Sequence, residues 1–577
     1  MTMSASRAPF SKIVSRFLLA FCGRALACAA LAALLPALLA SLGCSSSKET
    51  PAGGDDAGPP PVTAAPFTLA LGADKLPVLQ GATATVDVVL TRQGDFAGPV
   101  TLAAVGLPTG ATLVPAVIAA GQTTATLTVA ADAAAPHALP SPVTIQGTAG
   151  ADVASAPLTV TIYGPPGSLD TSFGGGKVVV PVGAGDDYAY AVAVDAMGRV
   201  LIAGRAAEGL GDFALVRLDR DGALDATFGI AGKVTTDFAG GADTAYGVAV
   251  QTDGKIVVAG TATVAGTGQD FAVARYLDSG ALDPTFGGGT GKVTTAFGAD
   301  SDTAYALLLQ ADGKIVLGGD GNQGSSTTGI DFTLARYGAD GTLDATFGAG
   351  GKVITAVAPN GGRDSIYALA LQTVAGLPLL VAAGGEGDFQ LARYTMAGTL
   401  DPTFGTTAGS GKGTINGMLG TSIGAARAIQ IAADGKILVA GHADHDFALV
   451  RLDAAGAPDP TFGTGGHTIT AVSPANWDEV QAMAIAADGK IVLAGWSYEG
   501  TGSSANFVLG RYGEDGLLDP TFGTAGLVTT PVAAGMRSDQ ASGVVLQADA
   551  RVPAVRVVAA GFASASNNDF VATRYWQ

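Results

Sequence analysis

The sequence has few charged residues, few histidines and few cysteines. Charged residues make up only 14 % of its 577 residues, and there are four histidines. The three cysteines, Cys22, Cys28 and Cys44, lie near the start of the chain, so the remainder has neither a disulfide nor a thiolate metal site. The signatures GxSxG, HExxH, CxxC and the phosphate loop are absent. No motif therefore indicates an enzyme class, and no organic cofactor is expected.

The abundant residues are small, apolar or acidic. Glycine occurs 84 times, apolar residues make up 48 % of the chain, and the net charge is −18. Small apolar residues mixed with many turn formers favour short strands joined by tight turns over helices. An acidic surface repels nucleic acid, so we expect no nucleic-acid partner.

Residues 1–43 have the pattern of a secretory signal peptide, a basic head followed by a long apolar run. Its last residues, Ser41-Leu42-Gly43, together with Cys44 resemble a bacterial lipobox. The resemblance implies that Cys44 is lipidated and becomes the first residue of the mature chain. An uncleaved anchor helix is the alternative, because the apolar run approaches the length of a membrane span.

Ser45 resembles the residue that follows the lipidated cysteine in lipoproteins of the outer membrane. The resemblance implies a bacterial cell-envelope protein, periplasmic or surface-exposed, that is attached to the membrane through its lipid. Residues 44–66 are rich in Pro, Gly, Ser and Asp, and we predict that they form a disordered linker.

Residues 67–163 contain six or seven short alternating runs separated by turn residues, such as FTLAL, ATVDVVL and TTATLTVA. This spacing predicts an antiparallel β-sandwich. The phrase from Gly98 to Pro115 resembles the immunoglobulin-like modules of bacterial surface proteins. The buried Cys-Trp-Cys set of antibody domains is absent, so the resemblance implies the architecture and a spacer role.

Residues 167–577 contain seven copies of one sequence repeat, with a period of 55 to 61 residues. The phenylalanine of the LDxTFG phrase marks each copy: Phe173, Phe228, Phe286, Phe347, Phe404, Phe462 and Phe522. Each copy has four strand candidates, which in the second copy span 233–236, 245–251, 255–259 and 270–276. Four strands in seven copies predict an all-β fold with a seven-bladed β-propeller of four-stranded blades.

The ends of the array indicate a closed ring. It begins with a lone strand at 177–180 and ends on a strand of the fourth type at 568–575, so the first strand can complete the last blade. The strand at 245–251 is built from small residues and is expected nearest the axis. A solenoid is the alternative, but its terminal repeats should be atypical. We expect a monomer.

The phrases LDPTFG, GKVTT, QxDGKIVVAG and DFALARY resemble the delta-60 repeat, a bacterial family of β-propellers with no defined biochemical role. The resemblance covers all seven copies. Copies four and seven replace the Asp-Gly-Lys turn with residues 374–378 and 549–553, and we expect looser hairpins there.

Recurrence separates structural residues from candidate site residues. The Asp before each TFG phrase and the Arg of each fourth strand occur seven times, and one site does not need seven copies. We interpret this Asp as a turn acceptor, the Phe as a plug between blades and the Arg as a partner across strands. A site is expected on the face where the connections differ between copies.

Copies five and six place imidazoles, carboxylates and aromatic rings on that face. These residues, which could bind a sugar or a metal, are His442, Asp444, His445, Trp477, Asp478, Trp496 and Tyr498. Scattered loop residues are the alternative interpretation.

Acidic residues precede the axial strand in six copies, and Asp243, Asp302 and Asp364 are the candidate ligands of a calcium ion. Single Asp residues that close turns explain the same pattern without metal.

The sequence thus predicts a lipid-anchored envelope protein whose propeller, without catalysis, recognises a protein or glycan partner. The alternative is a propeller hydrolase or lyase that acts on an extracellular polysaccharide or peptide. The scarcity of histidine favours the first.

Overall fold

The computed structural model describes residues 65–577, except for 208, 323–329, 358–363, 406–412, 421–422, 474–475, 499–503, 534–537, 550, 552–554 and 565. The predicted signal peptide, Cys44 and nearly all of the predicted linker lie outside the described residues. Within the described ranges, no helix has the length and apolar character needed to cross a membrane.

The first described region is two β-sheets around one apolar core. One sheet has the strand order β1 (Phe67–Leu71), β3 (Thr83–Arg92), β7 (Thr124–Ala131) and β5 (Ala111–Leu113). The other has the order β2 (Lys75–Leu79), β9 (Asp152–Tyr163), β8 (Ala138–Ala149), β4 (Val100–Val105) and β6 (Ala116–Ile118). Alternating side chains of both sheets, among them Val88 and Val160, form the core.

This region differs from the prediction in two ways. It has nine strands instead of six or seven, and β2 pairs in parallel with β9. Both differences follow from short strands at sheet edges: β2 contains Pro77, and β5 and β6 lie on either side of Pro115. Proline is tolerated at sheet edges, where its missing N–H costs no ladder bond, but it conceals such strands in a sequence.

The second region consists of four-stranded antiparallel sheets, as expected for a propeller. In six of them the strands follow chain order. The first three sheets are β11 (Tyr188–Val194), β12 (Val200–Ala206), β13 (Asp212–Leu218) and β14 (Lys233–Thr236); β15 (Asp243–Val250), β16 (Ile256–Val264), β17 (Gly268–Tyr276) and β18 (Lys292–Thr295); and β19 (Thr303–Leu309), β20 (Ile315–Asn322), β21 (Ile330–Tyr337) and β22 (Lys352–Thr355). The next three are β23 (Ile366–Val374), β24 (Leu377–Gly384), β25 (Gln390–Thr395) and β26 (Thr414–Asn416); β27 (Gly424–Ile431), β28 (Ile437–Ala443), β29 (Asp446–Leu452) and β30 (His467–Thr470); and β31 (Asp478–Ile485), β32 (Ile491–Tyr498), β33 (Ala505–Tyr512) and β34 (Leu527–Thr530).

One further sheet joins the two ends of the array. It contains β35 (Asp539–Gln547), β36 (Arg556–Ser564) and β37 (Asn568–Trp576), and its fourth strand is β10 (Lys177–Val180). The register runs from Lys177 opposite Thr573 to Val180 opposite Phe570. The prediction that the lone first strand completes the last sheet is confirmed.

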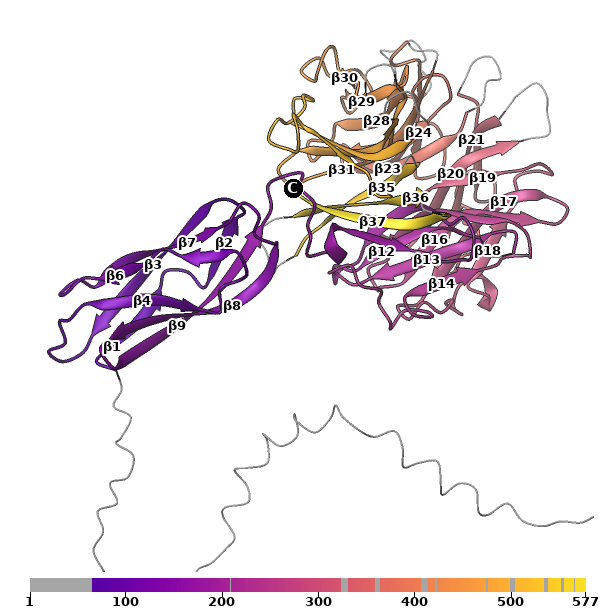
Figure 1. Cartoon of the computed structure of the whole chain (residues 1–577). Helices are drawn as coiled ribbons and strands as arrows, with labels where there is room; N and C mark the ends of the chain where they lie inside the picture. Colours follow the sequence, from indigo (N-terminus) through magenta and orange to yellow (C-terminus); the bar gives the residue numbers. More distant parts are fainter. Residues whose placement is uncertain are drawn as a thin grey trace, which may run out of the picture. The chain divides into compact units, whose positions relative to one another are not determined.

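The sheets form a ring around an axis. We number the strands of each sheet from the axis outward, so that the fourth strand of a sequence copy, which carries the recurring Arg, is the third strand of its sheet. The first strands of the sheets (β11, β15, β19, β23, β27, β31 and β35) each contact the next one, and β35 contacts β11. Figure 1 shows the yellow C-terminal strands β35 to β37 beside the magenta strands of the first sheets. The prediction that the strand at 245–251 lies nearest the axis is confirmed, since it is β15.

Side chains from neighbouring sheets pack against each other around the ring. Strands in the middle of a sheet are covered on both faces, which explains continuous apolar runs such as Ile256–Ala259. The TFG phenylalanine lies in this layer: Phe228 is fully buried between Leu201 of β12 and Val258 of β16. The prediction that it fills the space between sheets is confirmed.

Antiparallel order divides the connections between two faces. On the uniform face lie the hairpins between first and second strands and the TFG connections between third and fourth strands. On the divergent face lie the connections that lead into first strands and those between second and third strands. We keep these two names below.

Two hairpins on the uniform face test the turn predictions. In the second copy Gly254 has φ of 84°, the left-handed conformation expected of the Asp-Gly-Lys turn. In copy four, Val374 pairs directly with Leu377, and Ala375 and Gly376 adopt φ of 50° and 81°. The prediction of a looser hairpin there is wrong, because two residues with positive φ close the turn most tightly. Most of the corresponding turn in copy seven lies outside the described residues.

Candidate functional site

The recurring Arg, Asp and Phe form one repeated cluster, which we call the Arg–Asp–Phe triad. In each triad the Arg Nε donates to the Asp carboxylate at 2.8 to 3.0 Å, and the guanidinium lies 4.4 to 4.7 Å from the centre of the Phe ring. The sequence left the partner of this Arg open. The structure identifies it as the Asp of the TFG phrase.

The triads also connect neighbouring sheets. Arg217 donates through Nη1 to the carbonyl of Asp278 at 2.6 Å, in the next sheet's TFG connection. Although burial opposes the shift, hydrogen bonds from Thr285 and the charge of Arg275 lower the pKa of Asp283 to about 2. The seven triads thus explain the recurrence of these residues by structural contacts.

The acids before the first strands close loops on the divergent face. Asp187, Asp243, Asp302, Asp364, Asp478 and Asp539 each accept at least one backbone N–H from the preceding connection through Oδ2, at 2.7 to 3.0 Å. In Asp243 the other oxygen accepts the N–H of Thr263 at 3.2 Å. These bonds support the alternative in which the acids close turns.

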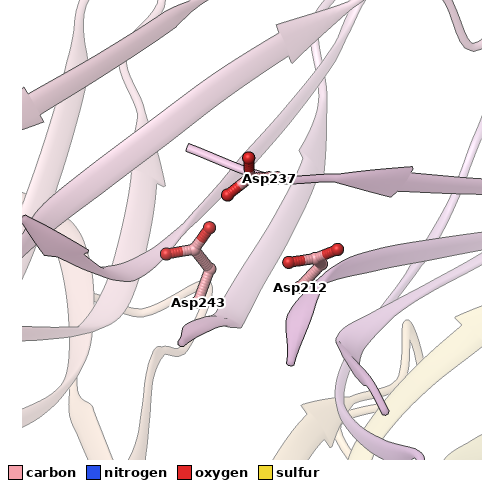
Figure 2. A group of neighbouring side chains, drawn as sticks. All are labelled: Asp212, Asp237 and Asp243. Carbon is pink, nitrogen blue, oxygen red and sulfur yellow. The ribbon is translucent and has the colours of Figure 1, made fainter. Parts of the chain in front are cut away.

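Of the three predicted metal ligands, only Asp243 has two other carboxylates close by. One ligand oxygen each from Asp212, Asp237 and Asp243 lie within 4.8 Å of one another, and this is the one such group of three among the residues that the structure describes. Figure 2 shows the three carboxylates converging from separate segments. Burial raises the pKa of Asp243 to about 6. The backbone hydrogen bonds of Asp243 oppose this shift, and the charges of Asp237 and Asp212 add to it. Neither Asp302 nor Asp364 belongs to such a group.

The predicted imidazole and indole groups meet on the divergent face. The ring of Trp477 lies 4.3 Å from that of His445, edge to face, and 6.4 Å from that of His442. Trp477 is 40 % exposed, whereas His442 is buried. Asp444 and His445 form a two-residue turn between β28 and β29, with φ of 48° and 77°. This left-handed turn holds the His445 ring against Trp477.

The other predicted residues lie beside this cluster. Trp496 and Tyr498 contact each other at 5.1 Å, and the N–H of Tyr498 donates to the carbonyl of Trp477 at 3.2 Å. Asp478 is fully buried and accepts backbone N–H groups of Val472 and Ser473, so its carboxylate serves the loop. We call His442, His445, Trp477, Trp496 and Tyr498 the rim cluster.

A second site lies on the ring axis, and sequence reasoning missed it. Every first strand carries a one-residue β-bulge at the same place. A bulge adds a residue to one strand and redirects its side chain. The extra residues are Tyr190, Tyr246, Tyr305, Tyr367, Arg427, Gln481 and Ser542. All seven line a cavity of about 390 Å³ in the half of the ring toward the divergent face, which we call the axial cavity.

A recurring glycine in the second strand makes each bulge possible. In the second copy it is Gly260, where a Cβ would lie 2.0 Å from the carbonyl oxygen of Thr244. The other copies have the same close approach, at 1.8 to 1.9 Å, for Gly204, Gly319, Gly384, Gly441, Gly495 and Gly561. The glycine of the VVAG phrase was therefore the available sequence signal for the axial site.

The axial cavity and the rim cluster are joined by one carboxylate. Glu479 accepts from Arg427 Nη2 at 3.0 Å and lies 3.6 Å from His442 Nδ1. The Arg427 guanidinium also stacks on Tyr367 at 4.1 Å. Burial lowers the pKa of His442, and Arg427 adds to this effect while Glu479 opposes it. The His442 ring is therefore held toward its neutral form.

Comparisons with known proteins agree with the repeat architecture. Six segments match a family model described as a domain of unknown function, DUF5122, beta-propeller: 198–228, 251–286, 310–347, 374–404, 432–462 and 486–522. Each runs from a uniform-face hairpin to the TFG phenylalanine. The corresponding seventh unit is interrupted, because its triad combines Arg574 with Asp170. No curated relative matches the chain.

Similarity to solved structures is weak. A DUF4784 family protein from Bacteroides caccae has 10 % identity and a TM-score of 0.20, over 81 % of this chain and 98 % of that chain. Domains 4–9 of the surface layer protein SbsC have 13 % identity and a TM-score of 0.14, over 88 % of this chain and 82 % of that chain. The ICAM-5 D1–D4 ectodomain fragment has 13 % identity and a TM-score of 0.16, over 78 % of this chain and 98 % of that chain. The sequence matches and the ring of four-stranded sheets support repeats of an uncharacterised β-propeller repeat family in this chain.

Proposed function

We propose that this chain is a lipid-anchored bacterial cell-envelope protein whose propeller binds a protein or glycan partner without catalysis. In this proposal Cys44 carries the lipid in the outer membrane, residues 44–66 are a disordered linker, and residues 67–163 are an immunoglobulin-like spacer. The seven four-stranded sheets within 167–577 are the blades of a seven-bladed propeller of delta-60 type, and the protein is monomeric.

One observation carries the binding role: the exposed Trp477 packs edge-on against His445 on the face where the copies differ. An exposed aromatic ring held rigidly offers contact area to a partner at little entropic cost. The recurring residues, in contrast, are used in triads and loop closure. The distribution of side chains therefore favours recognition by the rim cluster.

The test uses the full chain and extracts of envelope glycans and proteins immobilised separately. Trp477→Ala should weaken binding to one of the two extracts by about tenfold or more, the usual cost of a central aromatic contact. Ile230→Ala is the matched control, since Ile230 is 86 % exposed on the uniform face. Equal binding by wild type and Trp477→Ala, or equal loss in both variants, contradicts the proposal.

The anchor is tested separately. Metabolic labelling with palmitate should mark the wild type and not Cys44→Ala. Labelling of both would exclude lipidation at Cys44, while labelling of neither would favour the uncleaved anchor.

A hydrolase or lyase is the second candidate, and the His442–Glu479 contact favours it. A buried imidazole beside a carboxylate can act as a general base or acid. Turnover of an envelope polysaccharide that His442→Gln abolishes, while Trp477→Ala retains it, would replace the binding proposal by this one.

Calcium is a further proposal, limited to Asp212, Asp237 and Asp243. Three carboxylates are hard oxygen ligands of the kind that Ca²⁺ prefers. Millimolar Ca²⁺ should raise the thermal midpoint of the wild type over that in chelator, and Asp237→Asn should remove the difference. No difference in the wild type would leave these acids with turn closure alone.

A further inference from the structure

The axial cavity has an aromatic half. Tyr190, Tyr246, Tyr305 and Tyr367 follow one another around the axis, with ring centres 4.9, 5.1 and 5.1 Å apart. Each is only partly buried, so ring surface remains open to the cavity. These four residues come from four successive sheets and differ from their counterparts in the other three, so they are not required by the repeat itself.

The other half is polar. It presents Arg427, Gln481 and Ser542 from the bulges, and Gln540 from the start of β35. The amides and the hydroxyl can each donate and accept hydrogen bonds. A ligand with a flat apolar face and several hydroxyl groups matches both halves of the cavity.

The charge of Arg427 is already compensated. Glu479 lies 3.0 Å from its Nη2, and Tyr367 covers its guanidinium at 4.1 Å. An anionic ligand would have to compete with Glu479 and approach through a face whose recurring acids carry negative charge. A neutral hydroxyl group can instead accept from the guanidinium without displacing Glu479. The pair therefore favours a neutral ligand.

One buried nitrogen atom of a lining residue, Arg427 Nε, makes no hydrogen bond within the described structure. A buried polar atom without a partner is costly, and such atoms at a cavity mark a place for a ligand. Burial raises the pKa of Tyr246 to about 12 and also raises the pKa values of Tyr190 and Tyr305, so these three phenols stay available as neutral donors.

We propose that the axial cavity binds a neutral sugar residue, with one face of its ring on the tyrosine arc and its hydroxyl groups on Arg427, Ser542 and the two glutamines. A volume of about 390 Å³ lies within the range of roughly 300–1,000 Å³ of small-molecule sites. The lining side chains differ from those of the rim cluster, so each site is tested by its own variants. The sugar can be free or the terminal residue of a glycan.

The experiment is calorimetric titration of the full chain with glucose, galactose, N-acetylglucosamine, their β1,4-linked disaccharides, and glucuronic acid. At least one neutral sugar should bind, and more tightly than glucuronic acid. Tyr305→Leu should weaken that binding about tenfold or more, while Tyr305→Phe, which keeps the ring, should weaken it less. A thermal midpoint measured for each variant verifies that the ring is folded.

Two further variants separate this site from others. Ile230→Ala, on the uniform face, should leave sugar binding unchanged, and folded Tyr305→Leu should bind the envelope extract as wild type does, so failure here and failure of the rim proposal are distinguishable. Glu479→Gln leaves Arg427 uncompensated and should shift preference toward glucuronic acid. Tighter binding of a disaccharide than of its terminal monosaccharide identifies a glycan end, and equal binding a free sugar. The proposal is overturned if no neutral sugar binds, if wild type prefers glucuronic acid, or if folded Tyr305→Leu binds as wild type does.

Discussion

The sheet that joins the two ends of the array should be the most sensitive part of the ring, and Asp170 is the residue that tests it. Asp170 is fully buried and accepts from Arg574 Nε at 2.8 Å, while Arg556 Nε lies 3.0 Å from the same oxygen. Its other oxygen accepts from the N–H and hydroxyl of Ser172. The substitution Asp170→Ala therefore leaves two buried guanidinium groups without this carboxylate.

The magnitude follows from burial. Removing one partner of a buried ion pair costs about 3–5 kcal/mol, because the remaining charge is left uncompensated. Asp344 is the matched control, since it forms the same triad with Arg336 in the middle of the array. Its side chain is 11 % exposed, whereas that of Asp170 is fully buried. We expect Asp344→Ala to cost about 1.5–3 kcal/mol, as for a hydrogen bond to a charged group.

Urea unfolding followed by circular dichroism and by tryptophan fluorescence measures both costs. Trp576 reports on the joining sheet directly, because Arg556 lies 4.8 Å from its ring. Asp170→Ala should destabilise the chain by at least about 1 kcal/mol more than Asp344→Ala. Equal losses of unfolding free energy would refute the argument that the joining sheet depends more on its triad than the other sheets do.

Two other outcomes are expected. Gly260→Ala should destabilise the propeller by about 2 kcal/mol or more, because its Cβ would lie 2.0 Å from a backbone oxygen, whereas Gly72→Ala, with no atom closer than 3.5 Å, should cost far less; similar urea midpoints for the two variants would contradict this. Asp243 and Asp283 should give pH effects of opposite sign. The pKa of Asp243 is raised to about 6 from the usual 3.8, so its contribution to the free energy of unfolding is present below pH 4 and is lost as the pH rises through 6. Asp243→Asn should therefore flatten the pH dependence of the thermal midpoint between pH 4 and 6. The lowered pKa of Asp283, about 2, means that its contribution is present above pH 4 and is lost as the pH falls toward 2, so Asp283→Asn should flatten the profile there; unchanged profiles would refute both.

The fold could be predicted from the sequence because each copy repeats the same local signals. The strand at 233–236 and the Gly254 turn lie where they were expected, since alternation and turn residues act locally. The pairing of Arg217 with Asp225 could not be foreseen, because its hydrogen bond joins the third strand to a connection in three dimensions.

The candidate site was predictable only in part. Contact between His445 and Trp477 follows from neighbouring loops on one face, so the sequence was sufficient. Arg427 was missed because a bulge aims it at the axis, and strict alternation along a strand places it incorrectly. The sequence shows a tyrosine at the same position of four copies, but only the bulge in the structure shows that these tyrosines face one another.

The pairing of β10 with β37 has a consequence for how the molecule comes to be folded. Arg574 and Asp170 are 404 residues apart in sequence, so this contact closes a loop of nearly the whole ring and raises the contact order of the domain. The other sheets can form from segments close together in sequence, whereas β10 has no strand to pair with until β37 is in place. Its length of only four residues keeps that waiting edge short. We therefore expect closure to be the slow, final step of folding, and a peptide with the sequence of β37 should compete with it during refolding.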